Sequence, residues 1–155
     1  MKELSEYRAN LIEKLAAAAK AFRAACLDVK DPHAPLEEDG WNVHQVAVHT
    51  RDVDKLVYGL RARRTALEDN PEFQNFDGDA HMAEHYDAGE PLDELLDGFV
   101  VSIQYLAENL RTLPPQAWSR ESRHATLGSG FTLQTWVERD HAHIQEHLET
   151  VQKGK

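Results

Sequence analysis

The sequence has a single cysteine, no excess of basic residues and no long hydrophobic run, and each absence excludes a class of protein. Cys26 is alone in a chain of 155 residues, so no disulfide can form within the chain. No apolar stretch approaches the ~20 residues that a helix needs to span a bilayer. The formal net charge is −10. We therefore expect neither nucleic acid nor a membrane as a partner, because phosphate backbones and anionic lipids attract basic surfaces.

A secretory signal is also missing from the first residues, and the composition is otherwise that of an ordinary globular protein. A chain of this length can bury roughly two-thirds of its unfolded surface, so it needs no disulfide or structural metal to fold. We expect a cytoplasmic protein with one domain that spans residues 1–155.

Strand patterns and internal repeats are absent as well, whereas four segments have the apolar spacing of amphipathic helices. Asn42, followed by Gln45, forms a capping box at the start of the second segment, and Thr132 can cap the fourth. The connection over residues 67–89 is rich in turn formers and unusually long, which indicates a crossover or a functional loop. The sequence predicts an all-α four-helix bundle, with helices over residues 3–27, 42–66, 90–113 and 133–152.

Histidine is abundant, with nine residues, and helical periodicity separates these residues by direction. At about 100° per residue, His49 lies within the apolar stripe of the second helix, whereas His44 lies on its solvent side. His143 and His147 are four residues apart on one edge of the last helix, so their rings can share an ion. The spacing thus directs three imidazoles from two helices toward the interior.

Three neutral imidazoles with an open fourth position are typical of a catalytic rather than a structural zinc-type site. The open position can hold water or a thiol, and either group loses its proton more readily on a metal. An inward histidine can instead be a hydrogen-bonded core residue, and the spacing alone leaves that interpretation open. The candidate ligands are His49, His143 and His147.

Asp140 is a further polar residue that is predicted to face inward, beside Trp136 and His143. A buried carboxylate needs a partner. Asp140 could therefore orient a ligand imidazole, bind the ion itself or act as a general base, and the spacing does not rank these roles. For Asp52 and Asp54 we expect a solvated face.

Arg61 and Arg64 belong to a dense basic cluster near the end of the second helix. In one interpretation their charges complement the dipole at the helix C-terminus. In the other they bind the anionic group of a thiol cofactor or of a substrate. Both interpretations stay open on the sequence.

Two segments match His-x-x-Glu-His, the inverted zinc-protease signature, at His81–His85 and His143–His147. Glu146 is turned away from the second pair, and proteases of this type need a much larger scaffold. We therefore do not expect a peptidase. The first pair is expected to lie on a surface loop, and its role, like that of His141, stays open.

The segment from Trp41 to Asp54 resembles the second helix of the DinB superfamily, where an aromatic residue is followed eight residues later by a ligand histidine, here His49. The segment His143–His147 resembles the closing His-x-x-x-His of that family. Residues 128–133 resemble its glycine-then-Thr-Leu entry into the last helix. The chain is therefore similar, over most of its length, to a superfamily of small helical metalloenzymes that includes bacterial low-molecular-weight-thiol transferases.

The resemblance implies a bundle in which a long crossover between the second and third helices lets these two helices run parallel. It also implies a divalent transition metal, zinc or nickel, a thiol such as bacillithiol, mycothiol or glutathione, and a homodimer. The implied function is a metal-dependent thiol S-transferase or hydrolase that acts on a small molecule. The alternative is a non-catalytic, metal-binding stress-response module. DNA binding, which only the family's name suggests, is opposed by the acidic charge.

Overall fold

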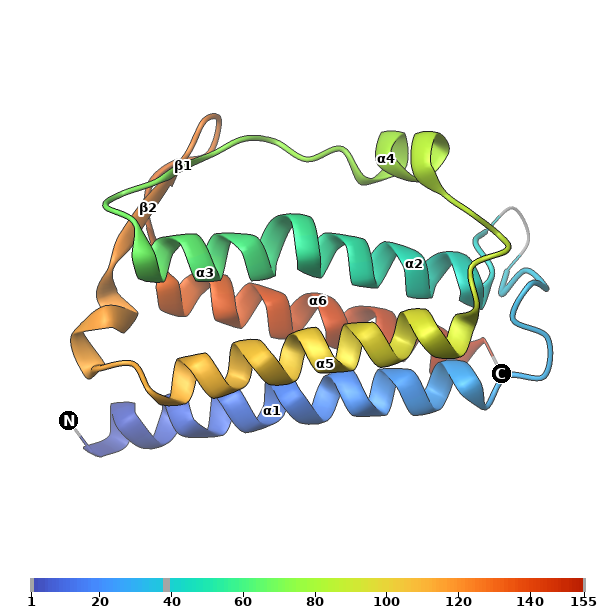
Figure 1. The fold of residues 1–155 in the computed structure, drawn as a ribbon, viewed down its shortest axis with the longest axis horizontal. Coiled ribbons are helices and arrows are strands. Elements are labelled where there is room, and N and C mark those ends of the chain that lie inside the picture. The colour runs from blue at the N-terminus through green and yellow to red at the C-terminus, as the bar shows by residue number, and fades with distance from the viewer. Residues whose placement is uncertain (1, 38–39, 155) are drawn as a thin grey trace.

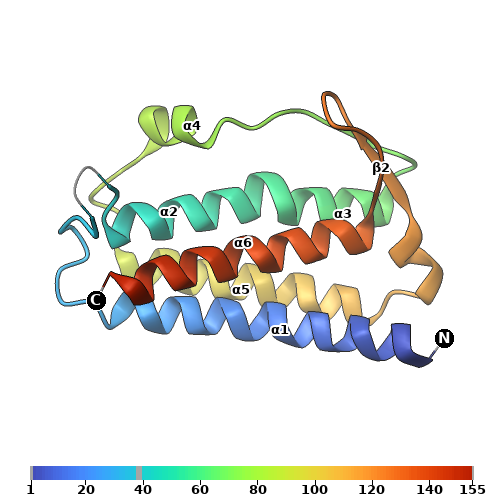
Figure 2. The same cartoon turned by 180° about the vertical axis from the view of Figure 1, so that it is seen from behind.

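The computed structural model describes residues 2–37 and 40–154, and four long helical rods dominate it (Figure 1). The first, third and fourth rods are α1, Lys2–Leu27, α5, Leu92–Arg111, and α6, Leu133–Lys153. The second rod is continuous and consists of α2, Val43–Val53, the π-helical turn η1, Asp54–Tyr58, and α3, Gly59–Leu67. On one side of α5 and α6 lies α1, and on the other side lies the α2–α3 rod (Figure 2). The prediction of an all-α four-helix bundle is confirmed.

The helices begin where the sequence carries capping residues. The Asn42 side chain accepts a hydrogen bond from the backbone N–H of Gln45, and the Gln45 side chain accepts one from the N–H of Asn42. At the start of α6, Thr132 accepts from the N–H of Thr135. Such bonds satisfy N–H groups that have no partner within the helix. The predicted helix boundaries consequently agree with the observed ones to about two residues.

The α2–α3 rod and α5 run in the same direction, so the chain returns along the length of the bundle between them (Figure 1). This returning crossover passes over the α2–α3 rod. It carries the short strand β1, Glu72–Phe73, and the helix α4, Gly78–His85. The predicted crossover between parallel helices is therefore present, and it places a covering segment over one face of α2.

A small sheet at one end of the bundle was not predicted, and neither was α4. After the 3-10 turn η2, Pro115–Ser119, the strands β2, Glu121–His124, and β3, Gly128–Thr132, form an antiparallel pair. β1 adds to β2 in parallel, which gives the order β1-β2-β3. The expectation of irregular connections was wrong here because these strands are too short to show an alternating pattern. Their pairing joins segments that are far apart in the sequence.

Inward side chains from all four rods fill the core. Phe22 of α1 meets Phe99 of α5 edge to face, with ring centres 5.8 Å apart. Trp136 of α6 is fully buried and donates its indole N–H to the Ser122 hydroxyl at 2.7 Å. Cys26 of α1 is also buried in this core. None of the described helices combines the length and the apolar character that crossing a bilayer requires.

The π-helical turn η1 changes which residues of the second rod face inward. Asp54 is 1% exposed, whereas Leu56, an apolar residue three positions after Val53 and four before Leu60, is 39% exposed. A π-turn adds one residue to the helical repeat and so rotates everything that follows it. Gly59 permits this turn, since a Cβ there would lie only 2.6 Å from the Asp54 carbonyl oxygen. The expectation that Asp54 lies on a solvated face was therefore wrong.

His44 is buried, so the prediction that it faces solvent was also wrong. Its Nε2–H donates to the Glu90 carbonyl oxygen at 2.7 Å, and its Nδ1 accepts from the Tyr86 hydroxyl at 2.7 Å. The His33 ring stacks on it at 4.7 Å. Two connections at the end of the bundle thus cover the face of α2 that a single-helix pattern assigns to water.

Candidate metal centre

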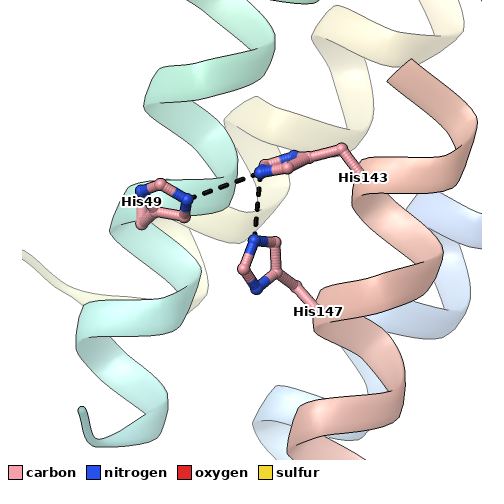
Figure 3. Close-up of side chains that lie close together, drawn as sticks. All are labelled: His49, His143 and His147. Atoms are coloured by element: carbon pink, nitrogen blue, oxygen red, sulfur yellow. Dashed lines mark hydrogen bonds between the residues drawn. The ribbon is translucent and has the colours of Figure 1, made fainter. Parts of the chain in front are cut away.

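Three imidazoles meet in the space between α2 and α6. His49 extends from α2, and His143 and His147 extend from successive turns of α6 (Figure 3). Nε2 of His143 lies 3.4 Å from Nε2 of His49 and 3.0 Å from Nε2 of His147. Nitrogen ligands of one tetrahedral ion, each bonded at about 2.0–2.1 Å, lie about 3.3 Å apart. The spacing of these nitrogens therefore fits a single small divalent ion.

Among the described residues, these three histidines are the one group of metal-ligating side chains whose ligand atoms all lie within 4.8 Å of one another. Their role as ligands stays a prediction, but the donor set has the chemistry of a transition-metal site. Imidazole nitrogen suits zinc, nickel, copper and iron, and is a poor ligand for calcium or magnesium. The residues present thus fit the metal that the sequence resemblance implies.

Burial keeps these imidazoles uncharged. It lowers the pKa of His49 to about 4, with a further contribution from the charge of His147. It lowers the pKa of His143 to about 3, with contributions from both of the other rings. Burial also lowers the pKa of His147. At neutral pH the three rings therefore carry free lone pairs, which a metal requires of its ligands.

Aromatic rings and the crossover surround the three histidines. The Trp41 ring lies 5.0 Å from the His49 ring, and the Tyr58 ring lies 5.5 Å from the His143 ring. The backbone of Gly78 passes so close that a Cβ there would lie 3.2 Å from Cε1 of His49. The crossover thus closes one side of the centre and holds the His49 ring in place.

A pocket of about 300 Å³ opens beside His49 and His143. It is lined by residues of four parts of the chain: the α2–α3 rod, the crossover, the β2–β3 hairpin and α6. Helical spacing identified His49, His143 and Arg61 among its lining residues, but gave no indication of Tyr58, Asn75, Phe76, His124, Leu127 and Arg139. The crossover and hairpin residues come from segments without helical periodicity, so no spacing argument could have placed them at this centre.

Two guanidinium groups give this pocket a positive wall. Arg61 is largely buried, donates to the carbonyl oxygen of Gln74 at 2.9 Å, and lies 4.8 Å from the Trp136 ring. Arg139 lies 5.7 Å from the same ring. In the described part of the chain neither has a carboxylate within 4.0 Å. Burial, followed by the charges of Arg61 and Arg139, lowers the pKa of His124 in the same wall.

Arg64, the second arginine proposed from the sequence, does not line this pocket. It forms a two-point ion pair with Glu68, at 2.8 Å and 2.9 Å, and lies over the Phe73 ring at 5.0 Å. The structure therefore brings Arg61 next to the three histidines and leaves Arg64 on the outside of α3.

Asp140 faces inward and is fully buried. Neither of its oxygens has a hydrogen-bond donor in the described residues, and neither does Oδ1 of Asp54. Burial, and then the neighbouring Asp54 carboxyl, raise the pKa of Asp140 well above its usual value. Burial also raises the pKa of Asp54, which the Arg63 charge partly offsets. The two carboxyls are thus buried neighbours, and ionisation of both together is disfavoured.

The remaining candidates lie outside the centre. His81 and His85 belong to α4, where their rings stack at 4.4 Å, and His81 Nε2 lies 3.3 Å from a carboxylate oxygen of Asp52. Asp52 is therefore half-buried in an ion pair rather than fully solvated. His141 lies in a separate surface recess of α1 and α6, and Glu146 points to solvent, as its helical position indicated.

Comparisons with known proteins agree with this architecture. Residues 9–143 match the family model of the mycothiol maleylpyruvate isomerase N-terminal domain. The structure is similar to that of YfiT from Bacillus subtilis, described as a probable metal-dependent hydrolase with an unusual four-helix bundle topology. The TM-score is 0.86 at 22% identity, over 96% of this chain and 86% of that one. No curated protein matches in sequence. The similarity to the DinB superfamily is confirmed.

Proposed function

This chain belongs to the family of mycothiol maleylpyruvate isomerase N-terminal domains, and we propose that it is a metal-dependent enzyme whose ion is held by His49, His143 and His147. One observation carries the proposal: the three nitrogens are spaced for a single ion, uncharged, and placed beside a pocket. Three imidazoles leave further coordination positions for a reacting group. A buried histidine with only a packing role would not need two similar neighbours at this distance.

The bound ion would supply Lewis acidity that lowers the pKa of a thiol or of water. Residues around the three histidines would bind the anionic group, exclude water and restrict the ligand rings. Arg61 and Arg139 attract and orient an anionic group of the thiol or of the substrate, because each guanidinium has several fixed donors. The crossover at Phe76 and Gly78 excludes water from the side of His49. Tyr58 stands over His143 and limits the rotation of that ring.

The proposed reaction is a thiol S-transfer or a hydrolysis on a small anionic molecule. The family is named after mycothiol maleylpyruvate isomerase, and this name supports a low-molecular-weight thiol as the cofactor. The description of YfiT as a probable metal-dependent hydrolase supports water as the alternative nucleophile. We propose zinc or nickel as the ion, and a homodimer in the cytoplasm as the form in which the protein acts.

Metal analysis of protein purified without a His-tag tests the site. We expect one divalent ion per chain in the unmodified protein, and the loss of that ion in His49→Ala and in His147→Ala. His33→Ala, which removes an exposed histidine outside the cluster, is the matched control and should keep the ion. If both cluster variants keep a full complement of metal, the assignment of the ligands is wrong.

A screen of thiols against electrophilic and ester substrates tests the activity. We expect turnover that requires both the ion and Arg61, with Arg61→Gln raising KM more than it lowers kcat, since the arginine binds an anionic group in ground and transition state alike. One ion per chain without turnover on any thiol or ester would instead identify a non-catalytic metal-binding module.

A further inference from the structure

A second pocket, of about 480 Å³, lies between the second rod and α5. These two rods run side by side along one face of the bundle (Figure 1). Arg51, Asp54, Lys55 and Arg63 contribute from the rod, and the other lining residues come from α5. None of the residues that line this pocket also lines the pocket of the metal centre. It is therefore a separate space, with the π-helical turn η1 forming part of both walls.

The second pocket is basic, although the chain as a whole carries a net charge of −10. Arg51 is neutralised by carboxylates of Asp52, at 2.9 Å, and Glu90. Lys55 and Arg63 have no carboxylate within 4.0 Å in the part of the chain that the structure describes. A local reversal of charge in an acidic protein concentrates anions at that point of the surface.

The floor of the pocket is apolar and open. Phe99 of α5 is 1% exposed, while Tyr105, two turns further along, exposes 63% of its surface at the rim. Gly98, directly before Phe99 and also a lining residue, lies inside a 20-residue helix, where glycine costs roughly 0.5–1 kcal/mol relative to alanine. A Cβ on Gly98 would meet no atom within 4 Å. Packing within the chain therefore does not explain a glycine at this position. A flat ligand that lies on α5 would explain it, because a side chain at residue 98 would occupy the same space.

Asp54 limits the charge that the pocket can accept. Asp54 is 1% exposed and lines the pocket, and its Oδ1 has no hydrogen-bond partner among the residues that the structure describes. The ideal Cβ position of Gly59 is 3.0 Å from this oxygen and 3.3 Å from Nη1 of Arg63, so these two groups lie near one another. Asp54, the one acidic residue among those that line this pocket, thus partly offsets the charge of Arg63. The charge of Lys55 is left uncompensated, which favours a monoanion over a dianion.

We propose that this pocket is a second ligand site, which binds a small aromatic monocarboxylate. The carboxylate lies at Lys55, with the Arg63 guanidinium as a second donor. The ring lies on the bare backbone of Gly98, against Phe99 and beside Tyr105. A carboxylate paired with a cation satisfies the charge, and an aromatic body buries the apolar floor that a hydrated inorganic anion would leave exposed.

Calorimetric titration of metal-free protein tests the site, with benzoate, phenylacetate and inorganic phosphate as probes. Without a metal, a carboxylate has no ion to bind at the histidines. We expect saturable binding of the two aromatic carboxylates and weaker binding of phosphate. Lys55→Gln should weaken binding of benzoate about tenfold, the value of one good charged hydrogen bond. Gly98→Leu, which fills the pocket at a helix position that tolerates a side chain, should abolish it.

Three controls make the outcome decisive. Lys20→Gln removes an exposed lysine of α1 and should leave benzoate binding unchanged. Arg61→Gln should also leave it unchanged, and a loss there would place the carboxylate in the pocket of the metal centre instead. Sedimentation of the unmodified protein and of Gly98→Leu should give the same molecular mass.

Three results would overturn the proposal: equal benzoate affinity in Gly98→Leu and in the unmodified protein, tighter binding of phosphate than of benzoate, or no saturable binding of either aromatic carboxylate. A dimer that dissociates in Gly98→Leu would also contradict it, because the groove would then hold a second copy of this chain.

Discussion

Two clusters of titratable side chains lie between the second rod and α6, one half-buried and one fully buried, and they contain opposite kinds of group. The histidine cluster consists of His49, His143 and His147, and the carboxyl pair consists of Asp54 and Asp140. Burial disfavours charge in both clusters. It favours the neutral form of the histidines, beside a pocket, and the protonated form of the Asp140 carboxyl in the interior. Burial thus keeps the imidazoles as neutral bases beside a pocket that a metal can enter. In the interior, which a metal cannot reach, it keeps the Asp140 carboxyl as an acid.

The comparison predicts that the two clusters respond to pH in opposite directions. In the metal-free protein the folded pKa of His49 is about 4 and that of His143 about 3, below the ordinary 6.5. The unfolded chain therefore binds more protons between these values, and the free energy of unfolding falls as the pH drops from 6.5 toward 4. Because the rings are partly exposed, we expect the free energy of unfolding to fall by about 2 kcal/mol in total, which is less than the full pKa shifts imply. Urea unfolding of metal-free protein at a series of pH values measures it.

A matched pair of variants sharpens this prediction. His143→Gln should flatten the loss of stability below pH 6.5, whereas His33→Gln, an exposed position, should leave the slope unchanged. An identical slope in His143→Gln and in the unmodified protein would mean that these rings do not titrate as buried groups.

The carboxyl pair predicts a smaller effect of opposite sign. The folded pKa values of Asp54 and Asp140 are raised above 3.8, so the folded protein holds protons that the unfolded chain has released. Stability from this pair is lost as the pH rises through the folded values. Asp140→Asn places an amide beside Asp54 that can donate a hydrogen bond and cannot ionise, and should raise the free energy of unfolding by about 1 kcal/mol at pH 8.

The gain in Asp140→Asn should shrink toward about pH 3, below the ordinary aspartate pKa of about 3.9, where the carboxyls of both states are largely protonated. Metal binding serves as the internal reference, since this substitution leaves all three candidate ligands in place. A lower free energy of unfolding for Asp140→Asn at pH 8 would contradict this prediction. It would mean that a hydrogen-bond donor stabilises the ionised Asp140 carboxylate in the folded protein.

The smallest predicted effect concerns how the crossover supports the histidine cluster. In Gly78→Ala the new Cβ would approach Cε1 of His49 to 3.2 Å, so the ring must shift by a few tenths of an ångström. We expect metal affinity to fall about threefold, below the range of about 10–100-fold that is typical for loss of a supporting hydrogen bond. Competition with a chromophoric chelator measures the change. Gly98→Ala, at a glycine with open space, should leave it unaltered.

The two helices that carry the histidines also differ in how far their sequence predicts them. α6 is an unbroken α-helix, so the i, i+4 spacing of His143 and His147 is enough to align their rings. The second rod contains a π-turn and is covered on several sides. The spacing directed His49 toward the bundle interior, but it placed His44 in solvent and Asp54 on a polar face, and both are buried. A helical pattern describes one helix and contains no information on the loops that cover it.

The positive wall of the metal centre shows the same limit. Arg61 could be suggested from its place in a basic cluster, but Arg64, three residues further on, is held by Glu68 on the outside. Arg139 joins Arg61 only because α6 packs against α3. Residues from the crossover and from the β2–β3 hairpin complete the pocket, and their positions depend on pairings between segments distant in sequence.

The sequence by itself determined the four helical rods, the crossover, and the direction of the candidate ligands, because apolar periodicity and capping act within one helix. Only the tertiary structure decided that the three imidazole nitrogens come within reach of one ion, and that Asp54 meets Asp140. It also decided which cations border each pocket. These features depend on the distance between helices and on the loops that close the bundle, and neither follows from the spacing along a single helix.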